Sequence, residues 1–470
     1  MEILLRSAAI FLNLVGLITL PIFSLYAKFF KKCERPPKIE NKVLTMSATE
    51  LADKIRTQEL KSIDVVEAFI ARLRDVRDVV NGVVLDRYAE ARREALRADE
   101  ICLTTPVEEI MTKYPLLGVP FTVKESCAVK GMPLEVGNKA RIGIKATEHG
   151  EAVQRLVDAG AIPLCVSMNP EYCLSWETGN LLRGVCRNPY DTRRTPGGSS
   201  GGEGALNACA ASVFGVGSDI AGSIRLPSLF NGLFGHKPTG GLVSTKGHFP
   251  NSTDPEFKEF LQIGPITRFA KDLPLLTFIL AGKNGHKLGF DRLIHTKDIK
   301  IYYTDFGFSF TRTPITADIS NSMTNAIQHF KQNGLVTKQI DTDFSEIMEI
   351  TLSMNLAMTD LPDLLAHVDN PKKILGDDGV LFFPTFHCPA FYHKTSLYNL
   401  GGVPFCTLFN IFGFPATNVP MGLGKDGLPV GFQVVAAPFQ DKLCLQIAGE
   451  LEAAFGGWVP PLMKEPIKDD

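Results

Sequence analysis

The chain has 470 residues, of which 45% are hydrophobic and 21% are charged, and its formal net charge is -2. The composition is that of a globular protein with a large core. The near-neutral charge excludes a general attraction to nucleic acid, so we expect no nucleic-acid partner. The ten cysteines follow no disulfide framework, which indicates buried thiols in a reducing compartment. No H-E-x-x-H or C-x-x-C pair is present, so we expect neither a metal nor a cofactor.

The first 32 residues predict a membrane anchor with a basic flank. Residues 7–27 carry no charge, and about 20 apolar residues can cross a bilayer as a helix. Asn13 and Pro21 interrupt this run, and a cleaved signal peptide is the alternative. The run is followed by Lys28, Lys31, Lys32, Arg35 and Lys38. This flank favours a single-pass anchor with the rest of the chain in the cytosol, on the endoplasmic reticulum or lipid droplets among other membranes.

Residues 33–43 read as a linker, stiffened by Pro36 and Pro37, and residues 44–470 as one α/β domain. The sequence from Ser47 to Glu50 is a capping box that opens a helix, and Ser62 is expected to cap a second helix. Later expected helices span 87–100, 150–159, 202–211 and 441–455. Expected strands span 118–124, 162–166, 213–217, 416–422 and 428–435. This alternation predicts helices packed around a largely buried sheet.

Two glycine-rich runs and a lysine are the features most suggestive of chemistry. Lys124 ends the strand predicted at 118–124, Ser199 lies in the run at 196–202, and Ser223 lies in the run at 217–225. A serine can act as a nucleophile when a neutral lysine supplies the base, and burial favours the neutral form of a lysine. Glycines let backbone N–H groups approach a developing oxyanion. The pattern therefore predicts a hydrolytic site that needs no histidine.

Residues 197–201 also fit G-x-S-x-G, the nucleophile elbow of α/β-hydrolases. An elbow requires a hydrophobic strand directly before the serine. Residues 187–196 are instead polar and contain two prolines, so no strand fits there. We therefore do not expect residues 197–201 to form a nucleophile elbow.

The lysine and both glycine runs closely resemble the amidase signature family over residues 44–458. The resemblance implies one domain with a mixed central sheet covered by helices on both sides. It also implies Ser223 as nucleophile, Ser199 as bridging serine and Lys124 as base. The backbone of Ile220, Ala221, Gly222 and Ser223 would form the oxyanion hole. Residues 199–204 and the apolar N-terminus resemble the membrane-anchored fatty-acid amide hydrolases in particular.

The chain departs from these relatives at two places. Ala221 stands where fatty-acid amide hydrolases usually have glycine, and the region 354–379 is shorter than the helical segment of relatives that helps to cover the substrate channel. By the same resemblance, Cys173 and Leu174 fall where relatives line the acyl pocket. Phenylalanines of the C-terminal half are a weak sign of a lipid substrate and a stronger sign of core packing.

The resemblance implies a hydrolase that cleaves fatty-acid amides to a fatty acid and an amine. A broad aryl or acyl amidase of the same fold and a catalytically silent lipid-binding homologue remain the alternatives. The amidase component of a glutamyl-tRNA amidotransferase is disfavoured by the apolar N-terminus. The sequence leaves the oligomeric state open, a homodimer included.

Overall fold

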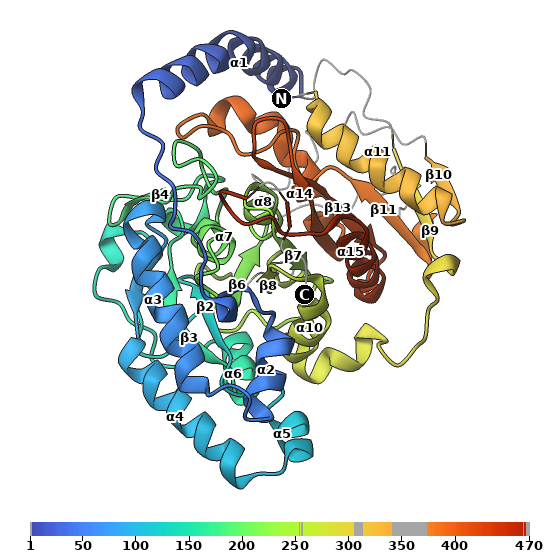
Figure 1. Cartoon of the computed structure of the whole chain (residues 1–470). Helices are drawn as coiled ribbons and strands as arrows, with labels where there is room; N and C mark the ends of the chain where they lie inside the picture. Colours follow the sequence, from blue (N-terminus) through green and yellow to red (C-terminus); the bar gives the residue numbers. More distant parts are fainter. Residues whose placement is uncertain are drawn as a thin grey trace.

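The computed structural model describes residues 2–252, 254, 257–304, 314–340, 374–463 and 465–466, without the side chains of residues 2–10, 12–14 and 17. Eleven strands form one mixed sheet in the order β1-β3-β2-β6-β8-β7-β12-β13-β11-β9-β10 (Figure 1). The strands of the N-terminal half are β1 (Val83–Asp86), β2 (Pro120–Lys124), β3 (Ile162–Ser167), β6 (Phe214–Asp219), β7 (Phe234–Lys237) and β8 (Gln262–Thr267). Those of the C-terminal half are β9 (Lys300–Tyr303), β10 (Thr337–Gln339), β11 (Gly379–Phe383), β12 (Ala416–Leu423) and β13 (Pro429–Ala436).

The centre of the sheet is covered on both faces. Every residue of β2, β3, β6, β8, β7 and β13 is buried, and successive side chains of a strand point to opposite faces. Helices α3 (Ser62–Val80) and α7 (Gly201–Ala208) contact β2, and α10 (Leu273–Ala281) contacts β8. Helices α11 (Ala317–Gln332) and α15 (Asp441–Phe455) contact β13. The predicted α/β class with a mixed sheet is confirmed.

Most expected elements occur within a few residues of their predicted bounds. Helix α2 (Ala48–Arg56) begins with the predicted capping box, in which Ser47 Oγ accepts from Glu50 N at 3.1 Å. The predicted helices at 87–100 and 150–159 are α4 (Tyr88–Thr104) and α6 (Glu151–Asp158). Helix α7 ends before the predicted residue 211, and Ala210 has φ +55°.

The predicted cap at Ser62 is wrong. Ser62 Oγ donates to Gly118 O at 2.9 Å, so it ties the helix to the chain entering β2. The first N–H groups of α3 are satisfied by the Asp99 carboxylate of α4, at 2.6 Å from Ser62 N and 3.1 Å from Ile63 N. A carboxylate from a different helix therefore caps α3 in place of the expected local hydroxyl.

Helix α1 (Glu2–Phe30) precedes the domain and runs along one end of the molecule (Figure 1). Its contacts are mainly with the 3-10 helix η7 (Ser396–Gly402), where the rings of Phe23 and Tyr398 lie 6.3 Å apart. Among the described residues, no helix is both long enough and apolar enough to span a membrane. Part of the predicted span at 7–27 falls on side chains outside the described ones.

Candidate active site

The site is built where two parallel strands end. Strands β2 and β6 pair in parallel through Thr122–Gly215 and Val123–Val216. Lys124 at the end of β2 and the loop that follows Asp219 in β6 therefore emerge at the same edge of the sheet. Ser199 lies two residues before α7, which contacts both strands. Carboxyl ends of parallel strands are a common place for ligand sites in α/β sheets.

Lys124 and Ser199 are in direct contact. Nζ of Lys124 lies 2.7 Å from Oγ of Ser199, and their exposed fractions are 0% and 1%. Nζ also lies 2.9 Å from Ser218 Oγ and 3.4 Å from Ser218 O. Among the described residues, no carboxylate forms an ion pair with Lys124. Lys124 therefore meets only hydroxyl and carbonyl oxygens in this buried position.

Ser218 connects Lys124 to a histidine. His248 Nε2 lies 2.9 Å from Ser218 Oγ, and His248 Nδ1 lies 2.7 Å from Pro250 O. Burial lowers the pKa of His248 to about 3, and the charge of Lys124 would act in the same direction. The imidazole is therefore neutral at neutral pH. Since a carbonyl oxygen only accepts, Nδ1 carries the hydrogen and Nε2 is the acceptor.

Ser223 lies on the loop between β6 and α8 (Arg225–Phe230), opposite the run that carries Ser199. Ser200 N donates to Ser223 O at 3.2 Å and so links the two glycine-rich runs. Ser223 is 5% exposed, and its hydroxyl makes no hydrogen bond to another described residue. The structure thus brings the three predicted catalytic residues to one site, with Lys124 and Ser199 already in contact.

The predicted oxyanion loop is held by the carboxylate of Asp219. Oδ1 of Asp219 accepts from Gly222 N at 2.8 Å, and Oδ2 accepts from Ile224 N at 3.0 Å. The N–H of Gly222 is therefore occupied, which corrects its expected place in the oxyanion hole. The N–H groups of Ile220, Ala221 and Ser223 have no partner among the described residues. These three donors are the ones available to an oxyanion.

Asp219 is itself fixed by a buried arginine. Arg225 Nε lies 3.1 Å from Asp219 Oδ2, and Arg225 Nη2 lies 3.0 Å from Asp219 Oδ1, with both side chains 0% exposed. Burial alone would raise the pKa of Asp219, but the Arg225 guanidinium holds that pKa well below its usual range. Asp219 therefore stays ionised and keeps its two backbone hydrogen bonds across the working pH range.

Two close approaches shape the same loop. Gly222 has φ +97°, and a Cβ there would lie 2.5 Å from Cys406 Cβ, so no other residue fits. Trp176 Nε1 donates to Ala221 O at 3.1 Å. This bond turns the Ala221 carbonyl toward the indole. The neighbouring residue Ser175 approaches the other run, because its carbonyl oxygen would lie 2.4 Å from a Cβ at Gly198. The loops around both serines are therefore packed against segment 175–179.

Glu203 in α7 is a second buried titratable group near the site. Thr122 Oγ1 donates to Glu203 Oε2 at 2.6 Å, and the side chain is fully buried. Burial raises the pKa of Glu203 from 4.5 to about 7, although the bond from Thr122 opposes the shift. The carboxyl group makes no direct contact with Lys124, Ser199 or Ser223, so its role is structural.

We expect Glu203→Gln to remove a pH dependence of stability. Between about pH 4.5 and 7 the unfolded carboxyl group ionises while the folded one keeps its proton, so rising pH destabilises the folded protein. The penalty reaches roughly 3 kcal/mol above pH 7. Urea unfolding at pH 5 and pH 8 should show the variant gaining stability over the parent only at pH 8. An equal difference at both values would contradict the assignment.

The predicted acyl-pocket residues Cys173 and Leu174 differ in exposure. Cys173 is partly buried with φ +62°, whereas Leu174 is 81% exposed.

Among the C-terminal phenylalanines, Phe383 packs with Phe405 and Phe409, and Phe386 packs with Phe391 and Phe230. Most of these rings are core, which is the stronger of the two sequence interpretations. Residues 354–373 of the shortened region 354–379 lie outside the described residues.

Sequence reasoning missed Ser218, His248 and Trp176 as members of the site. Ser218 stands inside the second glycine-rich run and could have been found there. His248 and Trp176 are far from the motifs in sequence and carry no local pattern. Only the fold brings them to Lys124 and Ala221.

Comparisons with known proteins find relatives in sequence and in fold. The sequence model of the amidase family matches residues 64–376 and 372–445. Fatty-acid amide hydrolase 2 of Homo sapiens is 34% identical, with 97% of both chains covered. A solved fatty acid amide hydrolase structure has the same fold, with a TM-score of 0.74, 20% identity, and coverage of 89% of this chain and 86% of that chain. A solved bacterial aryl acylamidase also shares the fold, with a TM-score of 0.71, 22% identity, and coverage of 88% of this chain and 97% of that chain.

Proposed function

The chain belongs to the amidase signature family and is an amide-cleaving hydrolase, and on that premise we propose that its substrates are fatty-acid amides. The products would be a free fatty acid and an amine. The 34% identity to fatty-acid amide hydrolase 2 over nearly the whole chain supports this substrate class. The contact between Lys124 Nζ and Ser199 Oγ at 2.7 Å, in a buried site with no paired carboxylate among the described residues, is the single observation that carries the proposed mechanism.

Acylation begins when Ser223 Oγ attacks the carbonyl carbon of the amide. The proton of Ser223 passes to Ser199 Oγ while the proton of Ser199 passes to Lys124 Nζ. The negative charge that develops on the carbonyl oxygen is stabilised by the free N–H groups of Ile220, Ala221 and Ser223. When the C–N bond breaks, Ser199 donates its proton to the leaving nitrogen and takes one back from Lys124. An unprotonated amide anion is a very poor leaving group, so this step is what an amide substrate demands.

Deacylation repeats the cycle with water. Water attacks the acyl-enzyme carbonyl and gives its proton to Ser199, whose own proton again moves to Lys124. The bond to Ser223 Oγ breaks, the proton returns through Ser199 to Ser223, and the fatty acid leaves. No group outside the three side chains and the loop amides is needed for the proton balance.

The hydrogen-bond directions around Ser218 aim the amine of Lys124. Because Nε2 of His248 is an acceptor, the Ser218 hydroxyl donates to it. Ser218 Oγ must then accept an N–H of Lys124 at 2.9 Å, and Ser218 O accepts the second at 3.4 Å. The lone pair of a neutral Lys124 is left facing Ser199, where the mechanism needs it.

We expect His248→Leu to lower kcat on an amide about tenfold with little change in KM, roughly the effect of one lost hydrogen bond. Without an acceptor at Nε2, the Ser218 hydroxyl is free to donate to Lys124 and compete with Ser199. His248→Gln retains an acceptor and a donor and should recover most of the rate. Steady-state kinetics of the two variants check this, and equal losses in both would contradict the positioning role.

Long-chain substrates separate the proposal from its alternatives. A fatty-acid amide hydrolase should cleave oleamide with higher kcat/KM than a short aryl amide such as acetanilide, whereas a general aryl amidase should reverse the order. A silent lipid-binding homologue should cleave neither and should resist labelling by a serine-reactive fluorophosphonate.

We also propose that the N-terminal segment holds the protein on a membrane. The uncharged run at 7–27 and the cations that follow it support this proposal. Carbonate extraction of membranes expressing the full chain tests it. Release of the protein into the supernatant would refute the anchor without bearing on the chemistry.

A further inference from the structure

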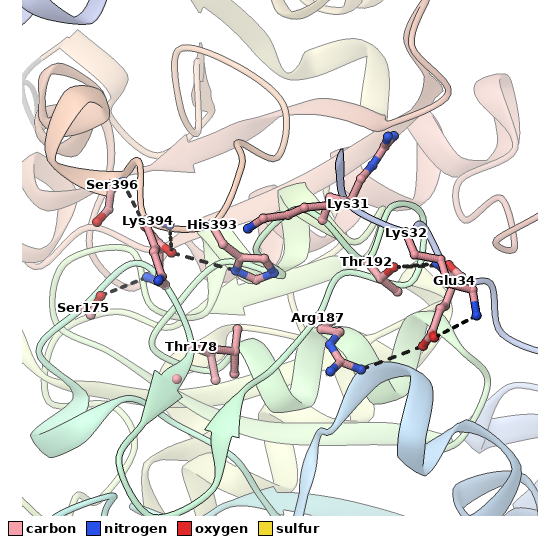
Figure 2. Close-up of a pocket in the computed structure, with 14 residues that line it drawn as sticks. Lys31, Lys32, Glu34, Ser175, Thr178, Arg187, Thr192, His393, Lys394 and Ser396 are labelled. Atoms are coloured by element: carbon pink, nitrogen blue, oxygen red, sulfur yellow. Dashed lines mark hydrogen bonds and ion pairs between the residues drawn. The ribbon is translucent and has the colours of Figure 1, made fainter. Parts of the chain in front are cut away.

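A basic cavity lies at the end of α1 and borders segment 175–179. It has a volume of about 610 Å³ and is formed by four parts of the chain: the residues after α1, segment 175–179, the loop at 185–193, and residues 393–396 (Figure 2). Its size is within the range of small-molecule sites. Its charged lining comprises Lys31, Lys32, Arg187, Arg193, Lys394, Glu34 and Glu177.

The two carboxylates of the lining are already engaged. Glu177 accepts from the backbone N–H of Lys394 at 2.7 Å and of Ser396 at 2.9 Å. Glu34 lies 3.5 Å from Lys32 Nζ and 3.9 Å from Arg187 Nη1. The ammonium groups of Lys31 and Lys394 form no ion pair with any described residue. The cavity therefore keeps a positive charge that its own acids do not cancel.

Two uncharged polar side chains complete the lining. Lys31 extends toward His393 (Figure 2), whose Nε2 is buried and has no hydrogen-bond partner among the described residues. Ser175 Oγ accepts from Glu177 N at 3.0 Å, so its own hydrogen remains available. Arg193 is already paired with Asp191 at 2.8 Å, and Arg187 Nη1 donates to Asp78 O at 2.9 Å. Lysine and hydroxyl donors, which bind phosphate, are the groups left available in the cavity.

The cavity adjoins an exposed apolar helix. Helix α1 ends one residue before Lys31, and it packs on η7, whose first residue Ser396 lines the cavity. The described side chains of α1 that remain exposed include a set that is apolar and large: Phe11, Ile18, Ile22, Phe23, Leu25, Tyr26, Phe29 and Phe30. An apolar helix followed at once by cations is the arrangement that meets acyl chains and headgroups in turn.

We propose that this cavity binds the phosphate of an anionic phospholipid headgroup in the membrane that α1 contacts. Lys31 and Lys394 would pair with the phosphate, and Ser175 would donate a hydrogen bond to the headgroup. The assignment rests on the proposed membrane association and does not depend on hydrolysis. It places the lipid surface beside segment 175–179, which backs the loop that carries Ser199.

The test is lipid binding to the detergent-solubilised full chain, measured by native mass spectrometry with dioctanoyl phosphatidic acid and dioctanoyl phosphatidylcholine. We expect one phosphatidic acid per chain, bound more tightly than phosphatidylcholine. Lys31→Gln with Lys394→Gln should weaken it about 30-fold, the effect of two charges near an anionic headgroup. Lys113→Gln with Lys297→Gln removes the same charge from exposed positions outside the cavity and should change affinity less than about twofold.

Three outcomes would overturn the proposal: equal weakening in the two double variants, no preference for phosphatidic acid, or displacement of the lipid by inorganic phosphate at equal concentration. The last would assign the cavity to free phosphate. Because binding is read without turnover, and Ser223→Ala can be measured in parallel, a failure here is distinguishable from a failure of the proposed hydrolase function.

Discussion

Ser223→Ala is expected to abolish amide hydrolysis, with a loss of about a million-fold in kcat, as removal of the nucleophile causes in other serine hydrolases. The variant loses the oxygen that forms the acyl-enzyme, while the loop around it stays tied by Asp219 and Arg225. It should fold with unchanged stability and should no longer react with a fluorophosphonate probe. Hydrolysis and labelling measured together check both statements.

Ser228→Ala is the matched control for the loss of one hydroxyl. Ser228 lies in α8, is buried, and donates to Ile224 O at 2.8 Å, away from Lys124 and Ser199. It should keep its labelling and most of its activity. Full activity in the Ser223→Ala variant would contradict the assignment of Ser223 as the nucleophile, whatever the control shows.

Lys124→Met is expected to reduce amide hydrolysis roughly 10⁴-fold and hydrolysis of the matching ester roughly 10²-fold. Both reactions lose the base that accepts the proton through Ser199. Only the amide also loses the proton that its leaving nitrogen requires, because an alkoxide leaves far more readily than an amide anion. The measurement is kcat/KM for oleamide and for methyl oleate with the same preparation.

Lys237→Met is a matched control because Lys237 is also fully buried, in β7, where burial lowers its pKa to about 7. Its Nζ donates to Pro238 O at 3.0 Å and touches neither serine. The control should leave the amide-to-ester ratio unchanged even if it destabilises the protein. Equal losses for amide and ester in Lys124→Met would contradict the proton-relay role.

Local patterns predicted the parts of the fold that depend on local chemistry. The Ser47 capping box, the apolar strand ending at Lys124 and the turn at 424–427 are each decided by neighbouring residues. The cap of α3 was mispredicted because its acceptor is Asp99, 37 residues away. The order of the eleven strands follows from long-range packing, which periodicity does not contain.

The candidate site also contains residues that local motifs reveal and interactions that depend on the fold. Lys124, Ser199 and Ser223 stand in motifs, so a resemblance could assign them. The occupation of Gly222 N by Asp219 could not be predicted, because it depends on how Arg225 holds that carboxylate. The same is true of His248, whose acceptor nitrogen matters only because Ser218 bridges it to Lys124.

The basic cavity also had no sequence signal beyond the cations after residue 27. Lys31 and Lys394 are 363 positions apart, and only the packing of α1 on η7 brings their segments to one cavity. The sequence favoured a role in membrane orientation for Lys31 and the other cations that follow residue 27, and the structure adds a lined cavity for an anion beside Lys31.

The proposed function is tested most directly by the release of oleic acid from oleamide by membranes expressing the full chain. Ser223→Ala membranes are the blank, and acetanilide represents the competing substrate class. We expect release that depends on Ser223 and a higher kcat/KM for oleamide than for acetanilide. No release by a protein that still labels with the fluorophosphonate would contradict the fatty-acid amide assignment.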